Sequence, residues 1–119
     1  MKRDKISISE NTVIVTGSDV WMTAMEITEL FGTTAGAVTA GIKSVLKTAV
    51  LNDYEVCRYI PLENGNRADV YNMEVICALA FRLNTYNTSE FRKWLMRKAV
   101  TPQQASTPII VQYKNGYIC

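Results

Sequence analysis

The hydrophobic residues of this chain recur every second position in some segments and every third or fourth position in others. In "KISISENTVIV", Ile6 and Ile8 alternate with serines, and Val13 to Val15 follow a turn at Glu10-Asn11. Alternation with a period of two is typical of strands. The start of the chain is therefore expected to form a β-hairpin.

The next segment has helical periodicity and signals for both helix ends. Thr23 and Glu26 have the spacing of a capping box, in which each side chain accepts a hydrogen bond from the other residue's backbone. Gly32 suits the left-handed conformation that ends many helices. A helix is predicted between these signals, with an apolar stripe of Met25 or Ile27, Leu30 and Phe31.

A second helix is expected directly after Gly32, with Thr33 or Thr34 as its cap. Its predicted core-facing residues are Val38, Ile42, Val45 and Leu46. Two short helices joined by a glycine turn predict a helix-turn-helix. Gly36 and Gly41 each cost about 1 kcal/mol of helix stability relative to alanine, which suggests close backbone approach to a partner. That partner is either DNA phosphate or another helix, from this chain or a second copy.

Residues 55–72 are predicted to form two strands joined by a turn at Asn64-Gly65-Asn66. A β-hairpin after a helix-turn-helix is the layout of a winged helix. Arg58 and Arg67 would lie in this wing, where they either contact the DNA backbone or are simply solvated beside an edge strand marked by Pro61.

Two further helices are predicted. Asn72 caps one that runs to about Leu83, and Thr88 or Ser89 caps the next. In the last helix Phe91, Trp94 and Leu95 should face the core, with Arg92, Lys93 and Arg97 on the opposite face. This basic cluster is either a solvated face or a phosphate-contacting one.

Charge is distributed unevenly along the chain. Residues 1–70 carry seven basic and nine acidic side chains, whereas residues 71–119 carry six and two. The two halves therefore have net charges of −2 and +4, and the positive charge is not concentrated on the second helix.

Composition excludes several classes of function. The chain has 119 residues, 48% of them hydrophobic, which predicts one folded domain. A membrane span is not predicted, because the sequence contains no run of eighteen apolar residues. Histidine is absent, so histidine triads and Cys/His zinc sites are excluded, and no enzymatic activity, cofactor or metal is predicted. Three widely spaced cysteines favour a reducing cytoplasm. The Gly36–Ser44 segment is not a phosphate-binding loop, because Ile42 separates Gly41 from Lys43.

Residues 101–108 are predicted to be a polar linker between the domain (residues 1–100) and a hairpin or arm (residues 109–119) that contains Asn115-Gly116. Two-stranded hairpins are marginal alone. The terminal strands are therefore expected to pair with each other, with the wing, or across a homodimer.

An ordered series of motifs runs along the chain: Val20-Trp21-Met22-Thr23, Leu30-Phe31-Gly32, Val56-Cys57-Arg58, Tyr71-Asn72 with Ile76, Arg82 and Asn84, and Phe91-Arg92 with Trp94. This series resembles the virulence-associated RhuM family. The resemblance covers roughly residues 13–100 and implies DNA binding, with no catalytic residues to transfer.

The sequence thus predicts an α+β, winged helix-turn-helix-like protein with four or five helices and short hairpins at the N-terminus, wing and C-terminus. The expected function is non-enzymatic binding of double-stranded DNA in a regulatory role. Major-groove contacts, mostly to phosphate, are assigned to Thr33, Thr34, Thr39, Lys43 and Lys47, and accessory contacts to Arg58, Arg67, Arg92, Lys93 and Arg97. The alternative is a protein–protein adaptor that uses helix 34–47 and the terminal strands.

Overall fold

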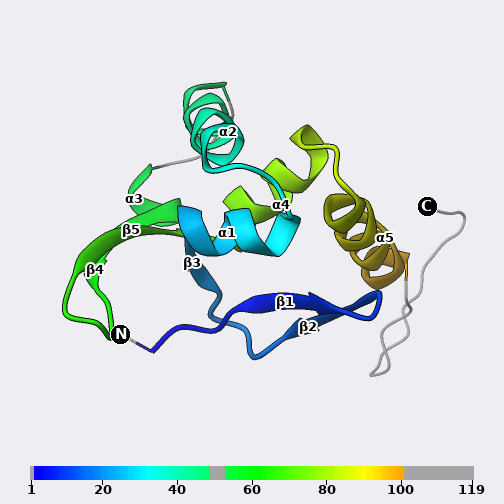
Figure 1. Cartoon of the computed structure of the whole chain (residues 1–119), viewed down its shortest axis with the longest axis horizontal. Coiled ribbons are helices and arrows are strands. Elements are labelled where there is room, and N and C mark those ends of the chain that lie inside the picture. Colours follow the sequence, from blue (N-terminus) through cyan, green and yellow to red (C-terminus); the bar gives the residue numbers. More distant parts are fainter. Residues whose placement is uncertain (1, 49–52, 101–119) are drawn as a thin grey trace, which may run out of the picture.

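Five helices and two small antiparallel sheets form an α+β fold in the computed structural model, which describes residues 2–48 and 53–100 (Figure 1). The elements are β1 (Ile6–Ser9), β2 (Thr12–Val15), β3 (Trp21–Thr23), α1 (Ala24–Phe31), α2 (Ala35–Thr48), α3 (Asp53–Val56), β4 (Cys57–Pro61), β5 (Arg67–Asn72), α4 (Met73–Arg82) and α5 (Tyr86–Val100). The predicted linker and C-terminal hairpin lie outside the described residues.

The N-terminal hairpin is confirmed. β1 and β2 pair in antiparallel register, with Ile6 opposite Val15 and Ser9 opposite Thr12. Glu10 and Asn11 form the two-residue turn with φ values of 50° and 63°, as a turn matched to the right-handed twist of the strands requires. Ile6 is buried and Ser7 is exposed, so the predicted alternation matches the observed faces.

The second sheet has the strand order β3-β5-β4. Its β4–β5 hairpin was predicted, but β3 was not, because three residues are too few to show a period. Trp21 lies opposite Asn72, and Cys57 opposite Tyr71 on the other side of β5. The predicted first strand began at residue 55, but residues 55 and 56 belong to the short helix α3, which was not predicted, and β4 begins at Cys57.

A backbone bridge joins the two sheets. Asp4 pairs in parallel with Val20, the residue before β3. The Asp4 amide donates to the Asp19 carbonyl at 3.1 Å, and the Trp21 amide donates to the Asp4 carbonyl at 3.2 Å. The chain then continues directly into β1.

Both predicted end signals of α1 are present. The Thr23 hydroxyl accepts from the Glu26 amide at 3.1 Å, and the Glu26 carboxylate accepts from the Thr23 amide at 2.8 Å. Gly32 has the left-handed conformation, with φ 61° and ψ 45°. Of the two alternatives for the stripe, Ile27 is buried and Met25 is 61% exposed.

Helix α2 packs on α1 and α4 through its predicted stripe. Val38, Ile42 and Val45 are buried, and Leu46 packs partly buried against them. Its cap is Thr34, whose hydroxyl accepts from the Ala37 amide at 3.1 Å.

The two glycines of α2 have different environments. A Cβ atom at Gly41 would lie 2.7 Å from Cδ2 of Leu79 on α4, whereas one at Gly36 would meet nothing within 4 Å. The close approach inferred for Gly41 is thus to a helix of the same chain.

Asn72 caps α4 as predicted, since its side-chain oxygen accepts from the amides of Glu74 and Val75. The predicted cap of α5 was wrong. The helix begins at Tyr86, and its cap is Thr85. The Thr85 hydroxyl accepts from the Thr88 amide at 3.1 Å, and in return the Thr88 hydroxyl accepts from the Thr85 amide at 2.8 Å. Thr88 is instead completely buried.

The core lies between α1, α2, α4, α5 and the N-terminal hairpin. Phe91 of α5 is fully buried and makes an edge-to-face contact with Phe31, with ring centroids 5.5 Å apart. Trp94 and Leu95 pack against this core, as predicted.

Candidate nucleic-acid interface

One long face of α2 is exposed, and the helix lies at the upper boundary of the molecule in Figure 1. Its exposed residues in the first half are small or carry only a hydroxyl, and its second half carries two exposed lysines. They are Ala35, Gly36, Thr39, Ala40, Lys43 and Lys47. This slim face can approach another molecule closely, with cations at one end only.

A third cation lies beside these lysines, on another helix. Arg82, at the end of α4, donates a hydrogen bond to the Ser44 hydroxyl of α2. Gly41 and Leu79 face each other where the two helices pack, and Ser44 and Arg82 each lie three residues further along. Sequence reasoning did not assign Arg82 to the site, because its position follows from the packing of α4 on α2.

The predicted threonines have separate environments. Thr33 is half-buried, and its amide donates to the Thr28 carbonyl at 3.2 Å. Thr34 is exposed, but its hydroxyl is used in capping α2, and Thr39 is exposed on the outer face. Of these three threonines, only Thr39 therefore presents a hydroxyl beside the lysines without a capping role.

The two arginines of the β4–β5 hairpin are exposed and stack on aromatic rings. The Arg58 guanidinium lies 4.2 Å from the Trp21 ring centroid, and that of Arg67 lies 5.1 Å from the Tyr59 ring centroid. Arg67 lies opposite Pro61, and Pro61 is an odd number of residues from Arg58 along β4. Because successive side chains of a strand point to opposite faces, the two arginines lie on opposite faces of the hairpin. They do not form one surface.

On α5, the prediction that Arg92 lies on the solvent-facing side was wrong. Arg92 is half-buried and donates to the carbonyls of Ala80 at 2.7 Å and Leu83 at 3.0 Å, so it caps the end of α4. Lys93 is exposed and pairs with Glu90 at 3.4 Å, and Arg97 is exposed.

The ten predicted contact residues are not gathered on one face. In Figure 1, the β4–β5 hairpin and α5 lie at opposite ends of the long axis, with α2 between them. The coherent part of the candidate site is the outer face of α2 with Lys43, Lys47 and the newly assigned Arg82.

The most charged interior region lies elsewhere, between β1 and α1. Arg3 is 5% exposed and donates to both carboxylate oxygens of Glu26, at 2.6 and 3.2 Å, and to the Trp21 carbonyl at 3.0 Å. Lys5 pairs with Glu26 at 3.1 Å. Burial alone would raise the pKa of Glu26, but hydrogen bonds from Arg3, the Thr23 amide and Lys5 lower it to about 2.

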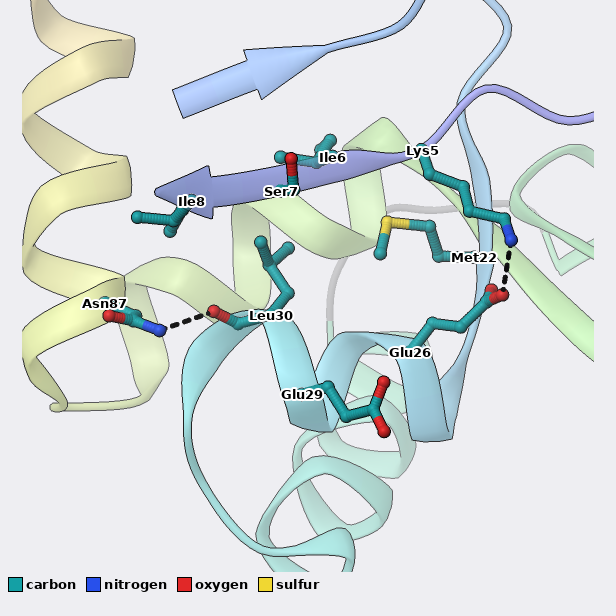
Figure 2. Close-up of a pocket in the computed structure, with 9 residues that line it drawn as sticks. All are labelled: Lys5, Ile6, Ser7, Ile8, Met22, Glu26, Glu29, Leu30 and Asn87. Atoms are coloured by element: carbon teal, nitrogen blue, oxygen red, sulfur yellow. Dashed lines mark hydrogen bonds and ion pairs between the residues drawn. The ribbon is translucent and has the colours of Figure 1, made fainter. Parts of the chain in front are cut away.

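Figure 2 shows Lys5 and Glu26 at one end of a hollow of about 320 Å³ between β1 and α1, and Asn87 at the other. The side-chain Nδ2 of Asn87 donates to the Leu30 carbonyl at 2.9 Å. Both ends are thus engaged in structural contacts, and the hollow is a poor match for an anionic backbone, because Glu26 and Glu29 line it.

The described cysteines, Cys57 and Cys77, are not in disulfides. Burial raises the pKa of the Cys77 thiol and also raises the pKa of Tyr71 to about 12. Within residues 2–48 and 53–100, no group of three potential ligands is placed to hold a metal ion. In the same ranges, no helix is long and apolar enough to cross a membrane.

Comparison with known proteins gives no assignment. No protein-family model matches the chain, and neither a curated protein nor a solved structure is significantly similar to it.

Proposed function

We propose that this protein binds double-stranded DNA, and that α2 is the helix that enters the groove. The observation that carries the proposal is the exposed outer face of α2, flanked at its C-terminal half by Lys43, Lys47 and Arg82. Three cations within reach of one helix can neutralise phosphates on the walls of a major groove, which is wide enough to admit a helix.

The order of the elements supports a winged helix-turn-helix arrangement. α1 and α2 are joined by the left-handed Gly32, and the β4–β5 hairpin follows. Because β3 pairs with β5, this hairpin belongs to a three-stranded sheet and has a fixed base. In helix-turn-helix proteins, the second helix lies in the major groove, and its partner crosses the backbone. The resemblance to the RhuM family adds the same expectation.

Small side chains on α2 favour phosphate and backbone contacts over base readout. Bidentate recognition of bases needs Arg, Lys, Asn or Gln, and α2 presents none of these before Lys43. Binding is therefore expected to depend strongly on salt and weakly on sequence. We include Arg58 as a secondary contact. We leave out Arg92, since its guanidinium group is engaged by α4, and Lys93, which pairs with Glu90 on α5. Homodimerisation stays a prediction that light scattering can check.

The test is a salt titration with a labelled duplex of random sequence. The logarithm of the binding constant falls linearly with the logarithm of the salt concentration, and each lost phosphate contact should make this slope less steep by about 0.9. Lys43→Ala combined with Lys47→Ala should therefore make it less steep by about 1.8. Arg82→Ala should reduce it by up to about 0.9. Lys93→Ala on α5 is the matched control and should leave it unchanged.

Two results would refute this assignment. Absence of binding even at low salt would exclude DNA and favour the adaptor alternative, in which the α2 face binds protein. A slope that falls with the Lys93 variant and stays constant with the α2 variants would move the interface to α5.

A further inference from the structure

The outer edge of β2 is unpaired within the described residues. The sheet contains β1 and β2 alone, and the Thr16 amide donates to the Lys5 carbonyl at 3.2 Å. Hydrogen-bonded pairs alternate along antiparallel strands, so Ile14 is bonded to Ser7, while the N–H and C=O groups of Val13 and Val15 point away from β1. In Figure 1, β1 lies between β2 and α1, which leaves this edge at the boundary of the molecule.

Apart from its short length, this edge lacks the features that usually protect an edge strand. Its sequence, Thr12-Val13-Ile14-Val15, has no charged residue, no proline and no bulge, and Ile14 is 48% exposed. Natural proteins protect such edges with lysine, proline or bulges, or by covering them. A two-stranded hairpin is also marginally stable without a third strand. The edge of β2 is therefore suited to accept another strand.

We propose that the occupant is the segment 109–113 of the same chain, which would extend the hairpin to a three-stranded sheet. Its sequence, Ile-Ile-Val-Gln-Tyr, is uncharged and rich in β-branched residues, as β2 is. Helix α5 packs on β2 and ends at Val100. The eight residues 101–108 can extend over about 26–29 Å, which is about twice the length of a four-residue strand, about 13 Å. Because α5 packs on β2, this length favours a segment of the same chain as the occupant.

The small size of the edge favours a tethered segment over a second copy. β2 offers the N–H and C=O groups of two residues, Val13 and Val15, which is a small contact for association of separate molecules. A short linker gives its segment an effective concentration of about millimolar, roughly a thousandfold above a micromolar protein solution. The same pairing is thus populated far more in the tethered arrangement.

Hydrogen exchange of the full chain, followed by NMR, tests the proposal. The Val13 and Val15 amides should exchange slowly, and Val111→Pro should speed their exchange at least about tenfold, because proline removes a donor and blocks strand pairing. Ser106→Pro is the control and should leave exchange unchanged, since the linker already contains Pro102 and Pro108. Val111→Asp serves as a second variant, and slow exchange at the Leu79 amide verifies the fold.

Three outcomes would overturn the inference. Fast exchange at Val13 and Val15 in the unmodified chain would show an uncovered edge. Protection that survives both Val111 substitutions would assign the cover to another segment. Protection that increases with protein concentration would assign it to a second copy.

Discussion

Substituting alanine at the two glycines of α2 should have opposite effects on stability. Gly36 and Gly41 lie in the same helix, so the change of residue is identical and only the surroundings differ. At Gly36 the new methyl group meets nothing within 4 Å. The variant should gain about 0.5–1 kcal/mol, because alanine loses less backbone entropy on folding than glycine.

At Gly41 the same gain is opposed by a steric clash. The added Cβ would lie 2.7 Å from Cδ2 of Leu79, which is completely buried and surrounded by core side chains. Overpacking of this kind costs about 1–3 kcal/mol. After the gain in helix propensity of about 0.5–1 kcal/mol, the net change should be a destabilisation of between about 0 and 2.5 kcal/mol. The two variants should therefore differ by about 1–3 kcal/mol in free energy of unfolding.

Urea unfolding followed by circular dichroism measures this difference, and thermal unfolding should show it as about 4 °C per kcal/mol. A double-mutant cycle with Leu79→Ala adds a direct check, because removal of the clashing methyl groups should make Gly41→Ala less harmful by about 0.5–3 kcal/mol. If Gly41→Ala stabilises as much as Gly36→Ala in the unmodified background, α2 does not pack on α4 as described here.

Three further predictions concern ionic contacts and DNA. The pKa of Glu26 is about 2 in the folded protein, against a usual 4.5. Its ion pairs therefore contribute fully to the free energy of unfolding above about pH 4.5, and this contribution is lost as the pH falls toward 2. The shift corresponds to about 3 kcal/mol, which solvent screening reduces to about 1–2 kcal/mol because the side chain is 24% exposed. Urea unfolding at pH 6 and pH 3 should show somewhat more than half of that loss in the unmodified protein, because pH 3 is still above the folded pKa, and a smaller loss in Glu26→Gln. Arg92→Ala should lower the free energy of unfolding by about 1.5–3 kcal/mol, because two carbonyls lose a charged donor, whereas Lys93→Ala should change it by under about 0.5 kcal/mol; equal effects would contradict the capping role. If α2 lies in the major groove, Thr39 and Ala40 can contact thymine methyl groups, so replacing thymine with uracil in the duplex should weaken binding in an anisotropy titration, and unchanged affinity would exclude such contacts.

Features set by a few neighbouring residues could be predicted from the sequence. The Thr23–Glu26 capping box, the Gly32 turn and the Asn72 cap each depend on atoms within four residues, and all three are present. The turn at Glu10-Asn11 was predictable for the same reason. These local signals placed α1, α4 and the N-terminal hairpin correctly.

Features that depend on distant residues were missed. β3 exists because Trp21 pairs with Asn72, fifty-one positions later, and three residues carry no detectable period. Arg92 had the spacing of a surface residue, yet the end of α4 provides carbonyl acceptors for it. The cap of α5 was misplaced because Thr85, Thr88 and Ser89 are all suitable residue types, and burial of Thr88 in the core decides between them.

The candidate site was predicted only in part for the same reason. The outer face of α2 followed from its helical period, and Lys43 and Lys47 were assigned correctly to that face. Arg82 could be assigned only after Gly41 was known to pack on Leu79, since that contact fixes how α4 lies along α2.

The bridge at Asp4 has a consequence for local unfolding. Because the backbone of this one residue is bonded to Asp19 and Trp21 while the next residues form β1, the hairpin cannot rotate against β3 without breaking both hydrogen bonds. Amide protons in β1 and in β5 should therefore report the same free energy of opening, as members of a single cooperative unit.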